Sequence, residues 1–226
     1  MFNNALSTDK GEQTRKHIFD CALDLFRENG FDATTMQQIA ARAEVVKSAA
    51  YYYFPGKEAI IQAYYELVQA EREKLCRGAF AQSKDLKTRL TIALHSKFDL
   101  ARNDRNLLGV VFRYTGEPKH PLSCLGAGTA EIRQRSMRIF QEAIALEDLP
   151  RDLQELLPLA LWSLQMGLLI LFLYDNSPGQ QRTRTLANGA MDLTLNLLKL
   201  ARLPILKPVR KRVLSLLREA ELLPVL

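Results

Sequence analysis

Three consecutive tyrosines, Tyr51 to Tyr53, follow the basic and hydroxyl side chains of Lys47 and Ser48. A tyrosine hydroxyl can donate a hydrogen bond to a phosphate oxygen while its ring packs on a sugar or on a thymine methyl group. The rings could also fill a core or form a stacking platform. Successive helical residues are rotated by about 100°, so three consecutive rings cannot all face inward. At least one ring must be exposed, and Phe54 is the better candidate for the core.

Residues that could support catalysis or metal binding are sparse. The chain has three histidines, and no Ser-His-Asp, Cys-His or paired-carboxylate arrangement stands out. Its three cysteines form no Cys-x-x-Cys spacing, which argues against a zinc site or a disulfide framework and fits a reducing cytoplasm. The first residues lack the apolar segment of a secretory signal. We therefore expect a cytoplasmic protein that is not an enzyme and needs no metal or cofactor.

The positive charge of the chain lies mainly near its C-terminus. The net charge is +6 over 226 residues. Residues 1–60 contain seven Lys and Arg against eight Asp and Glu, whereas residues 199–226 contain seven against two. Any affinity of the tyrosine region for nucleic acid must therefore come from positioned contacts and not from bulk charge.

The elements that must position these side chains are helices. Apolar residues recur with helical periodicity almost everywhere, and no stretch alternates convincingly as a strand, so the sequence predicts an all-α protein. The first predicted helix ends at Asn29-Gly30. The others cover about 34–42, 47–53, 57–80, 84–102, 105–114, 129–147, 151–174, 178–202 and 208–222.

Two of these helices have recognisable start signals. Thr34-x-x-Gln37 is predicted to form a capping box at the start of the helix that ends near Arg42. Ser177 precedes Pro178 and Gln180, which predicts a serine cap with proline in the first turn of the helix.

One predicted helix is apolar enough to suggest a membrane span. Leu156–Tyr174 is almost wholly apolar and long enough to cross a bilayer. Pro158, Ser163 and Gln165 interrupt it, and no basic cluster lies beside it to set an orientation. A helix that is apolar all round can instead be buried in a bundle or in a dimer, and we favour that interpretation.

The tyrosines close a helix-turn-helix pattern, in which a short capped helix, a tight turn and a second short helix follow a longer helix. The segment TRKHIFDCALDLFRENGFDATTMQQIAARAEVVKSAAYYYFPGKEAI resembles the N-terminal DNA-binding domain of the tetracycline-repressor (TetR) family over about 45 of the 226 residues. The matching features are Leu25-Phe26, Gly30-Phe31, Thr34-Thr35-Met36, Ile39-Ala40, Tyr51-Tyr52 with Phe54, and Lys57-Glu58.

This resemblance implies a set of contacts with double-stranded DNA. Gln37 matches a position that often reaches a base or a phosphate, and Lys57 matches a phosphate contact at a helix start. The groove-facing positions of the recognition helix are Lys47, Ser48, Ala49 and Tyr51, with Tyr52 and Tyr53 near backbone phosphates.

The resemblance also implies two domains and a bacterial regulator. Residues 1–58 would bind DNA, and residues 59–226 would bind an effector and dimerise, with an extra basic amphipathic helix in residues 206–226. The helices 151–174 and 178–202 would form a four-helix bundle with a second copy. We expect a homodimeric repressor that binds a palindromic operator and is released by a small-molecule effector. The candidate pocket residues are Phe98, Phe112, Tyr114, Met137, Phe140, Trp162, Gln165 and Met166.

Three departures from the family pattern keep another interpretation open. Glu44 stands where glycine is usual in the turn, Val46 replaces a hydroxyl cap, and Ala49 lacks a polar group for DNA. The chain could then be a helical interaction module whose helix-turn-helix no longer binds DNA specifically. A further alternative is an enzyme or a membrane-associated protein built around the apolar helix and the basic tail, where a membrane-surface helix is one interpretation of the tail.

Overall fold

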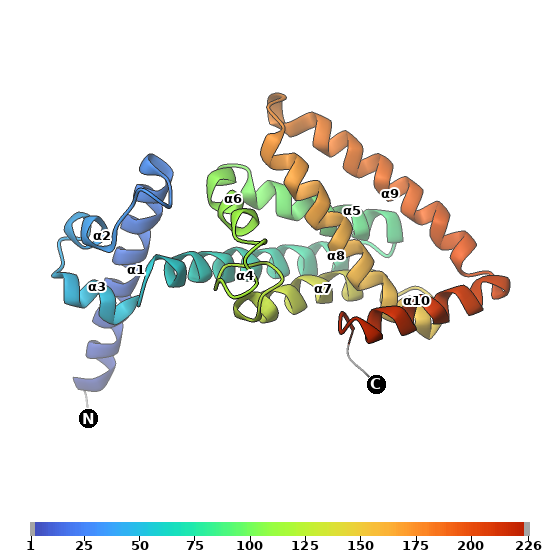
Figure 1. Ribbon diagram of the computed structural model, residues 1–226, viewed down its shortest axis with the longest axis horizontal. Helices are drawn as coiled ribbons and strands as arrows, with labels where there is room; N and C mark the ends of the chain where they lie inside the picture. The colour runs from blue at the N-terminus through green and yellow to red at the C-terminus, as the bar shows by residue number, and fades with distance from the viewer. Residues whose placement is uncertain (1–2, 224–226) are drawn as a thin grey trace. The chain divides into compact units, whose positions relative to one another are not determined.

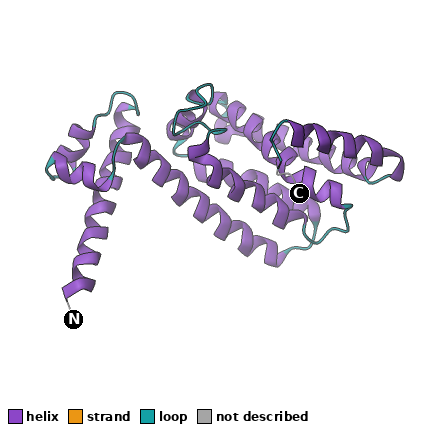
Figure 2. Ribbon diagram, turned by 60° about the horizontal axis from the view of Figure 1, so that its bottom comes forward, coloured by secondary structure: helices purple, strands orange, loops and turns teal. Residues whose placement is uncertain are grey.

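The computed structural model describes residues 3–223, and all regular structure in that range is helical (Figures 1 and 2). The predicted all-α class is confirmed. The α-helices are α1 Asn3–Asn29, α2 Met36–Arg42, α3 Lys47–Tyr53, α4 Lys57–Gln82, α5 Leu86–Ala101, α6 Arg105–Arg113, α7 Ala130–Ile144, α8 Arg151–Tyr174, α9 Gln181–Ala201 and α10 Lys207–Glu219. Short 3-10 turns are η1 Ala127–Thr129, η2 Pro178–Gln180 and η3 Pro204–Leu206.

The chain forms two compact units. Unit 1 comprises Met1–Val68 and Asn103–Glu131, and unit 2 comprises Gln69–Arg102 and Ile132–Leu226. Helix α4 begins in unit 1 and continues into unit 2. The division into functional domains at residue 58 stays a prediction, because contact within the chain does not delimit function.

The core of unit 1 lies between α1 and the two short helices. Ile18 and Phe26 of α1, Ile39 of α2 and Phe54 after α3 are all buried, which confirms the prediction for Phe54. Gly30 ends α1 with φ +84° and donates its backbone N–H to the carbonyl oxygen of Phe26. A residue in this left-handed conformation is the usual end of a helix, and glycine adopts it without strain.

The capping box of α2 lies one residue later than predicted. Thr35 is the N-cap and accepts from the backbone N–H of Gln38, whose side chain returns to the backbone N–H of Thr35 at 2.7 Å. Thr34 is instead fully buried and donates to the carbonyl oxygens of Leu25 and Gly30. The prediction of Thr34 and Gln37 was wrong because the same Thr-x-x-Gln spacing occurs in two adjacent registers, and only burial distinguishes them.

Unit 2 contains the long apolar helix. Helix α8 packs against α5, α9 and α10. Its residues Leu161, Leu168 and Phe172 are buried, whereas Leu171 and Tyr174 are exposed. Within the described residues, α8 is the one helix that is long and apolar enough to cross a membrane. Of its most apolar 18-residue segment, 44% is buried inside this chain.

The start of α9 differs from the prediction. Pro178 belongs to a 3-10 turn, and α9 begins at Gln181. The carboxylate of Asp175 accepts hydrogen bonds from the backbone N–H and hydroxyl groups of both Ser177 and Thr183. Asp175 rather than Ser177 therefore organises this helix start, because a carboxylate can accept from several donors at once.

The basic tail helix α10 packs on α8 of its own chain. Arg210 donates to Asp152 at 2.8 Å and Arg218 donates to Glu155 at 2.7 Å. Leu214, which lies between these two arginines in the sequence, is buried, whereas Val209 is exposed. The tail helix thus packs on the chain's own helix α8, and arginine–carboxylate pairs are part of that contact.

Candidate nucleic-acid interface and buried arginine cluster

The turn between α2 and α3 has an unusual backbone at Glu44. Its φ is +53°, a left-handed conformation that favours glycine. The backbone N–H groups of Glu44 and Val45 donate to the carbonyl oxygens of Ala41 and Ala40, so the tight turn forms without glycine. Val46 is the N-cap of α3 and offers no side-chain hydrogen bond. Both departures seen in the sequence thus weaken this turn locally without abolishing it.

Helix α3 presents a polar and aromatic face to solvent. Lys47 and Ser48 are exposed, and Tyr51 and Tyr52 are 44% and 81% exposed. The opposite face is anchored by Ala50, which is fully buried. A small residue at that position lets α3 lie close to the helices behind it, and the tyrosines then project outward as predicted.

The exposed side chains of α3 support one another. The Lys47 ammonium lies 5.8 Å from the centre of the Tyr51 ring, within the range of a cation–π contact. The rings of Tyr52 and Tyr53 meet edge to face with centres 5.1 Å apart, and Tyr53 is half-buried. These contacts limit the rotamers of the tyrosines before any ligand is bound.

The remaining predicted DNA contacts have different surroundings. Gln37 on α2 is exposed, and Ala49 is half-buried. The Lys57 ammonium donates to the carbonyl oxygens of Phe31 and Asp32 at 2.7 and 3.2 Å, and burial lowers its pKa. Lys57 therefore ties the loop after α1 to the start of α4, and its phosphate contact stays a prediction.

Sequence reasoning missed Arg15 at this interface. Its guanidinium lies 4.7 Å from the centre of the Phe54 ring and is exposed on its other side. Arg15 lies on α1 and outside the helix-turn-helix pattern, so spacing within that pattern could not identify it. Arg15 places a cation beside the end of α3. The net charge of the first 60 residues did not indicate a cation at this position.

The predicted effector residues do not all belong to one unit. Phe112 and Tyr114 lie in unit 1, where the Tyr114 ring stacks on His120 with centres 3.7 Å apart and its hydroxyl donates to Asp32. The other six lie in unit 2: Phe98, Phe140, Trp162 and Gln165 are buried, and Met137 and Met166 are half-buried.

Several of these buried residues surround an arginine that sequence reasoning missed. Arg72 on α4 has no exposed surface. Its guanidinium lies 5.7 Å from the centre of the Phe140 ring and donates to the side-chain oxygen of Gln165 at 3.1 Å. Gln165 in turn donates to the carbonyl oxygens of Ala93 and Leu94, both at 3.1 Å. No signal near Arg72 in the sequence identifies it, because the residues around it on α4, Gln69 and Glu73 among them, are polar.

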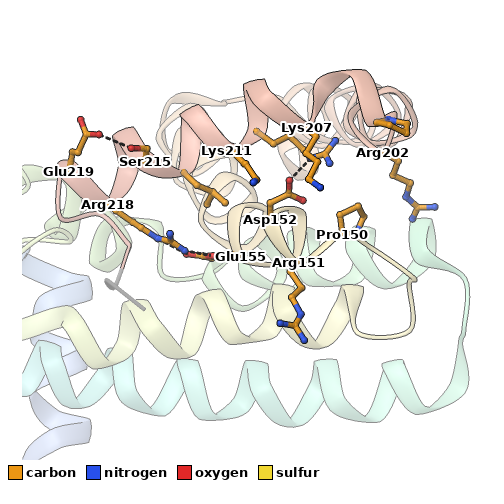
Figure 3. Close-up of a pocket in the computed structure, with 13 residues that line it drawn as sticks. Pro150, Arg151, Asp152, Glu155, Arg202, Lys207, Lys211, Ser215, Arg218 and Glu219 are labelled. Atoms are coloured by element: carbon orange, nitrogen blue, oxygen red, sulfur yellow. Dashed lines mark hydrogen bonds and ion pairs between the residues drawn. The ribbon is translucent and has the colours of Figure 1, made fainter.

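A separate groove lies between the start of α8 and the tail helix α10 (Figure 3). Its volume is about 1090 Å³. Lys207 and Lys211 extend toward Asp152 across it, and Asp152 is already paired with Arg210 (Figure 3). None of the predicted effector residues lines this groove. Its lining is charged and largely paired, unlike the aromatic surroundings of Arg72.

Two family models match the chain. The model described as "Bacterial regulatory proteins, tetR family" matches residues 18–64. The model described as "Tetracyclin repressor-like, C-terminal domain" matches residues 89–214, which is more than half of the chain. The matches therefore include the helix-turn-helix and most of unit 2.

Individual relatives agree with these matches. The HTH-type transcriptional regulator SrpR of Pseudomonas putida is 41% identical over 54 residues, 24% of this chain and 25% of that protein. The chain thus matches about a quarter of the length of this curated relative. The structure of the repressor FadR of Thermus thermophilus in complex with lauroyl-CoA has a TM-score of 0.58 at 22% identity, over 81% of this chain and 92% of that one. The SmeT–triclosan complex has a TM-score of 0.59 at 18% identity, over 79% and 90%. At these identities the two structures share the fold.

Proposed function

This chain belongs to the TetR family of DNA-binding transcriptional regulators, and we propose that it is a cytoplasmic homodimeric repressor that a small-molecule effector releases from a palindromic operator. The observation that carries the proposal is the exposed polar and aromatic face of α3. Lys47, Ser48 and Tyr51 are the groups that read or contact the major groove, and Tyr52 contacts the phosphate backbone.

An exposed apolar surface on α8 and α9 supports the homodimer. The two helices pack against each other and run side by side in unit 2 (Figure 1). Large apolar side chains remain exposed on both helices: Ile170, Leu171 and Tyr174 on α8, and Leu186, Leu193, Leu197 and Leu200 on α9. A second copy of the same surface would bury them in a two-fold symmetric four-helix bundle.

The proposed dimer accounts for binding without a basic surface. Each α3 contact is made twice, once in each half-site, so modest contacts add over the operator. Two recognition helices that match successive major grooves must lie about 34–36 Å apart. An effector that favours a different separation would release the operator, because only its preference between the two states can shift their populations.

The buried aromatic residues of unit 2 support effector binding. FadR and SmeT share the fold and were solved with lauroyl-CoA and triclosan, as their names state. Phe98, Phe140 and Trp162 would line the corresponding site in this chain, with Gln165 as a polar group among them.

The test is selection of random duplex DNA by the purified chain at about 150 mM salt, where weak phosphate contacts are screened. We expect enrichment of a palindrome that is lost with Tyr51→Ala and weakened by Tyr52→Ala. Lys16→Ala is the matched control, because Lys16 is an exposed cation of unit 1 paired with Asp20. In parallel, Leu193→Glu together with Leu197→Glu should give a monomer by sedimentation.

The alternative is an interaction module without specific DNA binding. The left-handed Glu44 and the absent side-chain cap at Val46 favour it, because both weaken the turn that holds α3. If the wild-type chain enriches no sequence while Glu44→Gly with Val46→Ser does, the alternative is correct and the turn is the reason.

A further inference from the structure

The interior of unit 2 holds a guanidinium that donates no hydrogen bond to any carboxylate of the described chain. Arg72 is fully buried and donates to neutral oxygens: Nε to the Ser96 hydroxyl at 3.0 Å, and Nη2 to the Ala93 carbonyl at 2.7 Å and to Gln165 at 3.1 Å. Its Nη1 atom makes one long contact, 3.4 Å, with the Ser136 hydroxyl. Arginine almost never occupies such a position without an anionic partner.

One N–H of this guanidinium has no acceptor among the described residues. A guanidinium carries five N–H groups, and the four contacts with Ser96, Ala93, Gln165 and Ser136 leave the second N–H of Nη1. An unmet donor on a buried charged group is costly, so a partner at this point would bind with favourable free energy.

Two carboxylates flank Arg72 in the sequence: Glu71 is exposed, and Glu73 is already engaged. Glu73 accepts from Nε and Nη2 of Arg135 at 2.8 and 3.0 Å, and from the side chain of Gln69 at 3.1 Å. The hydrogen bond from Arg135 is the main reason that the pKa of Glu73 is lowered. Glu73 therefore forms its ion pair with Arg135, and it attracts Arg72 without accepting a hydrogen bond from it.

Lys97 adds a second cation to the same region. Lys97 lies on α5 one turn after Ala93, so Lys97 and Ala93 occupy the same face of α5. The carbonyl oxygen of Ala93 accepts a hydrogen bond from Arg72 of α4. Lys97 is half-buried. Burial, aided by the positive charge of Arg72, lowers the pKa of Lys97 to about 7. Cys76, the nearest other titratable group on α4, has its pKa raised by burial and is not an anion at neutral pH.

A purely structural role does not account for this arrangement. A buried guanidinium kept for packing would be paired with a carboxylate or replaced by a neutral side chain, because an uncompensated charge costs free energy of folding. A buried guanidinium with an open donor, on the same side as a lysine whose charged form an anion would favour, instead forms a site that is complete only when an anion is present. Lys97 retains some exposed surface, so the site borders solvent on the side of this residue.

We propose that Arg72, Lys97, Ser136 and Gln165 form the anion subsite of the effector pocket, and that the effector is a small organic carboxylate with an apolar body. The open Nη1 N–H of Arg72 and the ammonium of Lys97 supply donors for one carboxylate group. The rings of Phe98 and Phe140 provide apolar surface for the rest of the ligand. This inference rests on the proposed function, of which it specifies the effector.

The experiment uses the full chain and paired probes. Acetate, hexanoate, decanoate and 4-phenylbutyrate are each compared with the corresponding neutral amide, at concentrations below micelle formation. Binding is followed by the fluorescence of Trp162, the one tryptophan of the chain, which lies one turn before Gln165 on α8. We expect carboxylates to bind at least tenfold more tightly than their amides, with affinity increasing along the series.

Lys97→Gln tests the site without removing the fully buried arginine. It should weaken carboxylate binding about tenfold and leave amide binding unchanged. Lys87→Gln is the matched control, because Lys87 lies on the same helix but is paired at the surface with Asp192. Binding at pH 8 should also take up protons, since a carboxylate favours the charged form of Lys97; calorimetry in two buffers of different ionisation enthalpy measures this uptake.

Proton uptake that is present in the wild-type chain and absent in Lys97→Gln would support the subsite, since a merely structural lysine would not produce it. Equal affinity for carboxylates and amides, or no binding of any carboxylate by the folded wild-type chain, overturns the inference. Failure of the two proposals is distinguishable. Operator binding without carboxylate binding leaves the regulator and removes the subsite, whereas carboxylate binding without operator binding does the reverse.

Discussion

Asp104 joins three helices of unit 1, and replacing it with asparagine tests how these helices are held together. Its carboxylate accepts from Nε and Nη2 of Arg27, on α1, at 2.7 and 3.0 Å. It also accepts from the hydroxyl of Tyr64, on α4, at 2.9 Å. Asp104 itself is the N-cap of α6. Asp104→Asn keeps the shape of the side chain but turns one acceptor into a donor that faces Arg27.

The expected loss can be worked out from the exposure of the partners. Hydrogen bonds to charged groups contribute about 1.5–3 kcal/mol when they are buried. The Asp104 side chain is 13% exposed, but that of Arg27 is 44% exposed, so water screens part of the interaction. We expect Asp104→Asn to lower the free energy of opening in this region by about 2 kcal/mol, which corresponds to a factor of about 30 in the equilibrium constant.

The assay is amide hydrogen exchange measured by mass spectrometry on peptides from α1 and α6. Protection in these peptides should fall about 30-fold in Asp104→Asn. Asp24→Asn is the matched control, because Asp24 pairs with the same Arg27 at 3.1 Å but is 58% exposed. An exposed pair contributes about 0–1 kcal/mol, so protection should change less than about fivefold. Equal losses in the two variants would refute the argument that burial, and not mere pairing, gives the contact its strength.

The pH dependence provides a second check. The hydrogen bond from Arg27 is the main cause that lowers the pKa of Asp104 below its ordinary value of 3.8. A lowered carboxyl pKa contributes stability above the unfolded-state value, and this stability is lost as pH falls through the folded-state value. The difference between wild type and Asp104→Asn should therefore be full at pH 7 and should shrink below about pH 4.

Four further variants test other parts of the structure. Phe54→Ala, at a residue 1% exposed, should lower the free energy of unfolding by about 3–5 kcal/mol in urea titration, whereas Tyr52→Ala should change it by less than about 0.5 kcal/mol. Glu44→Gly should raise it by about 1 kcal/mol, since glycine adopts a φ of +53° without strain. Asp175→Asn should lower the melting temperature by about 3 °C at pH 7. Hydrogen bonds from Ser177 and Thr183 hold the pKa of Asp175 below its ordinary range, so the substitution should have no effect at a pH low enough to protonate Asp175.

Local chemistry predicted the helices, but it did not predict every terminus. The apolar periodicity of α1 was sufficient to predict its buried face, and the glycine at position 30 was sufficient to predict its end. Both signals depend only on neighbouring residues. The start of α9 depends on Asp175, six residues before the helix begins. A pattern that places the cap directly before the helix cannot detect such an arrangement, so Ser177 was selected in its place.

The exposed face of α3 could be predicted, whereas the buried cluster of unit 2 could not. Consecutive tyrosines on a seven-residue helix must diverge, so helical geometry alone predicts that at least one is exposed, and the structure shows that Tyr52 is. Arg72 depends on acceptors from three other helices: the carbonyl of Ala93, the hydroxyl of Ser136 and the amide of Gln165. Its neighbours are 21 to 93 residues away, and nothing near Arg72 in the sequence distinguishes it from an exposed arginine.

The turn before α3 is locally unfavourable, yet it leaves the exposed face of α3 intact. Glu44 holds a left-handed backbone and Val46 leaves the first N–H groups of α3 without a side-chain cap. Yet Ala50 is fully buried and Phe54 closes the helix against α1, so tertiary packing holds what the turn does not. A recognition helix held mainly from behind keeps its outer face free of capping side chains. The family pattern of glycine and hydroxyl residues in this turn therefore contributes stability, and its loss at Glu44 and Val46 removes none of the exposed side chains of α3.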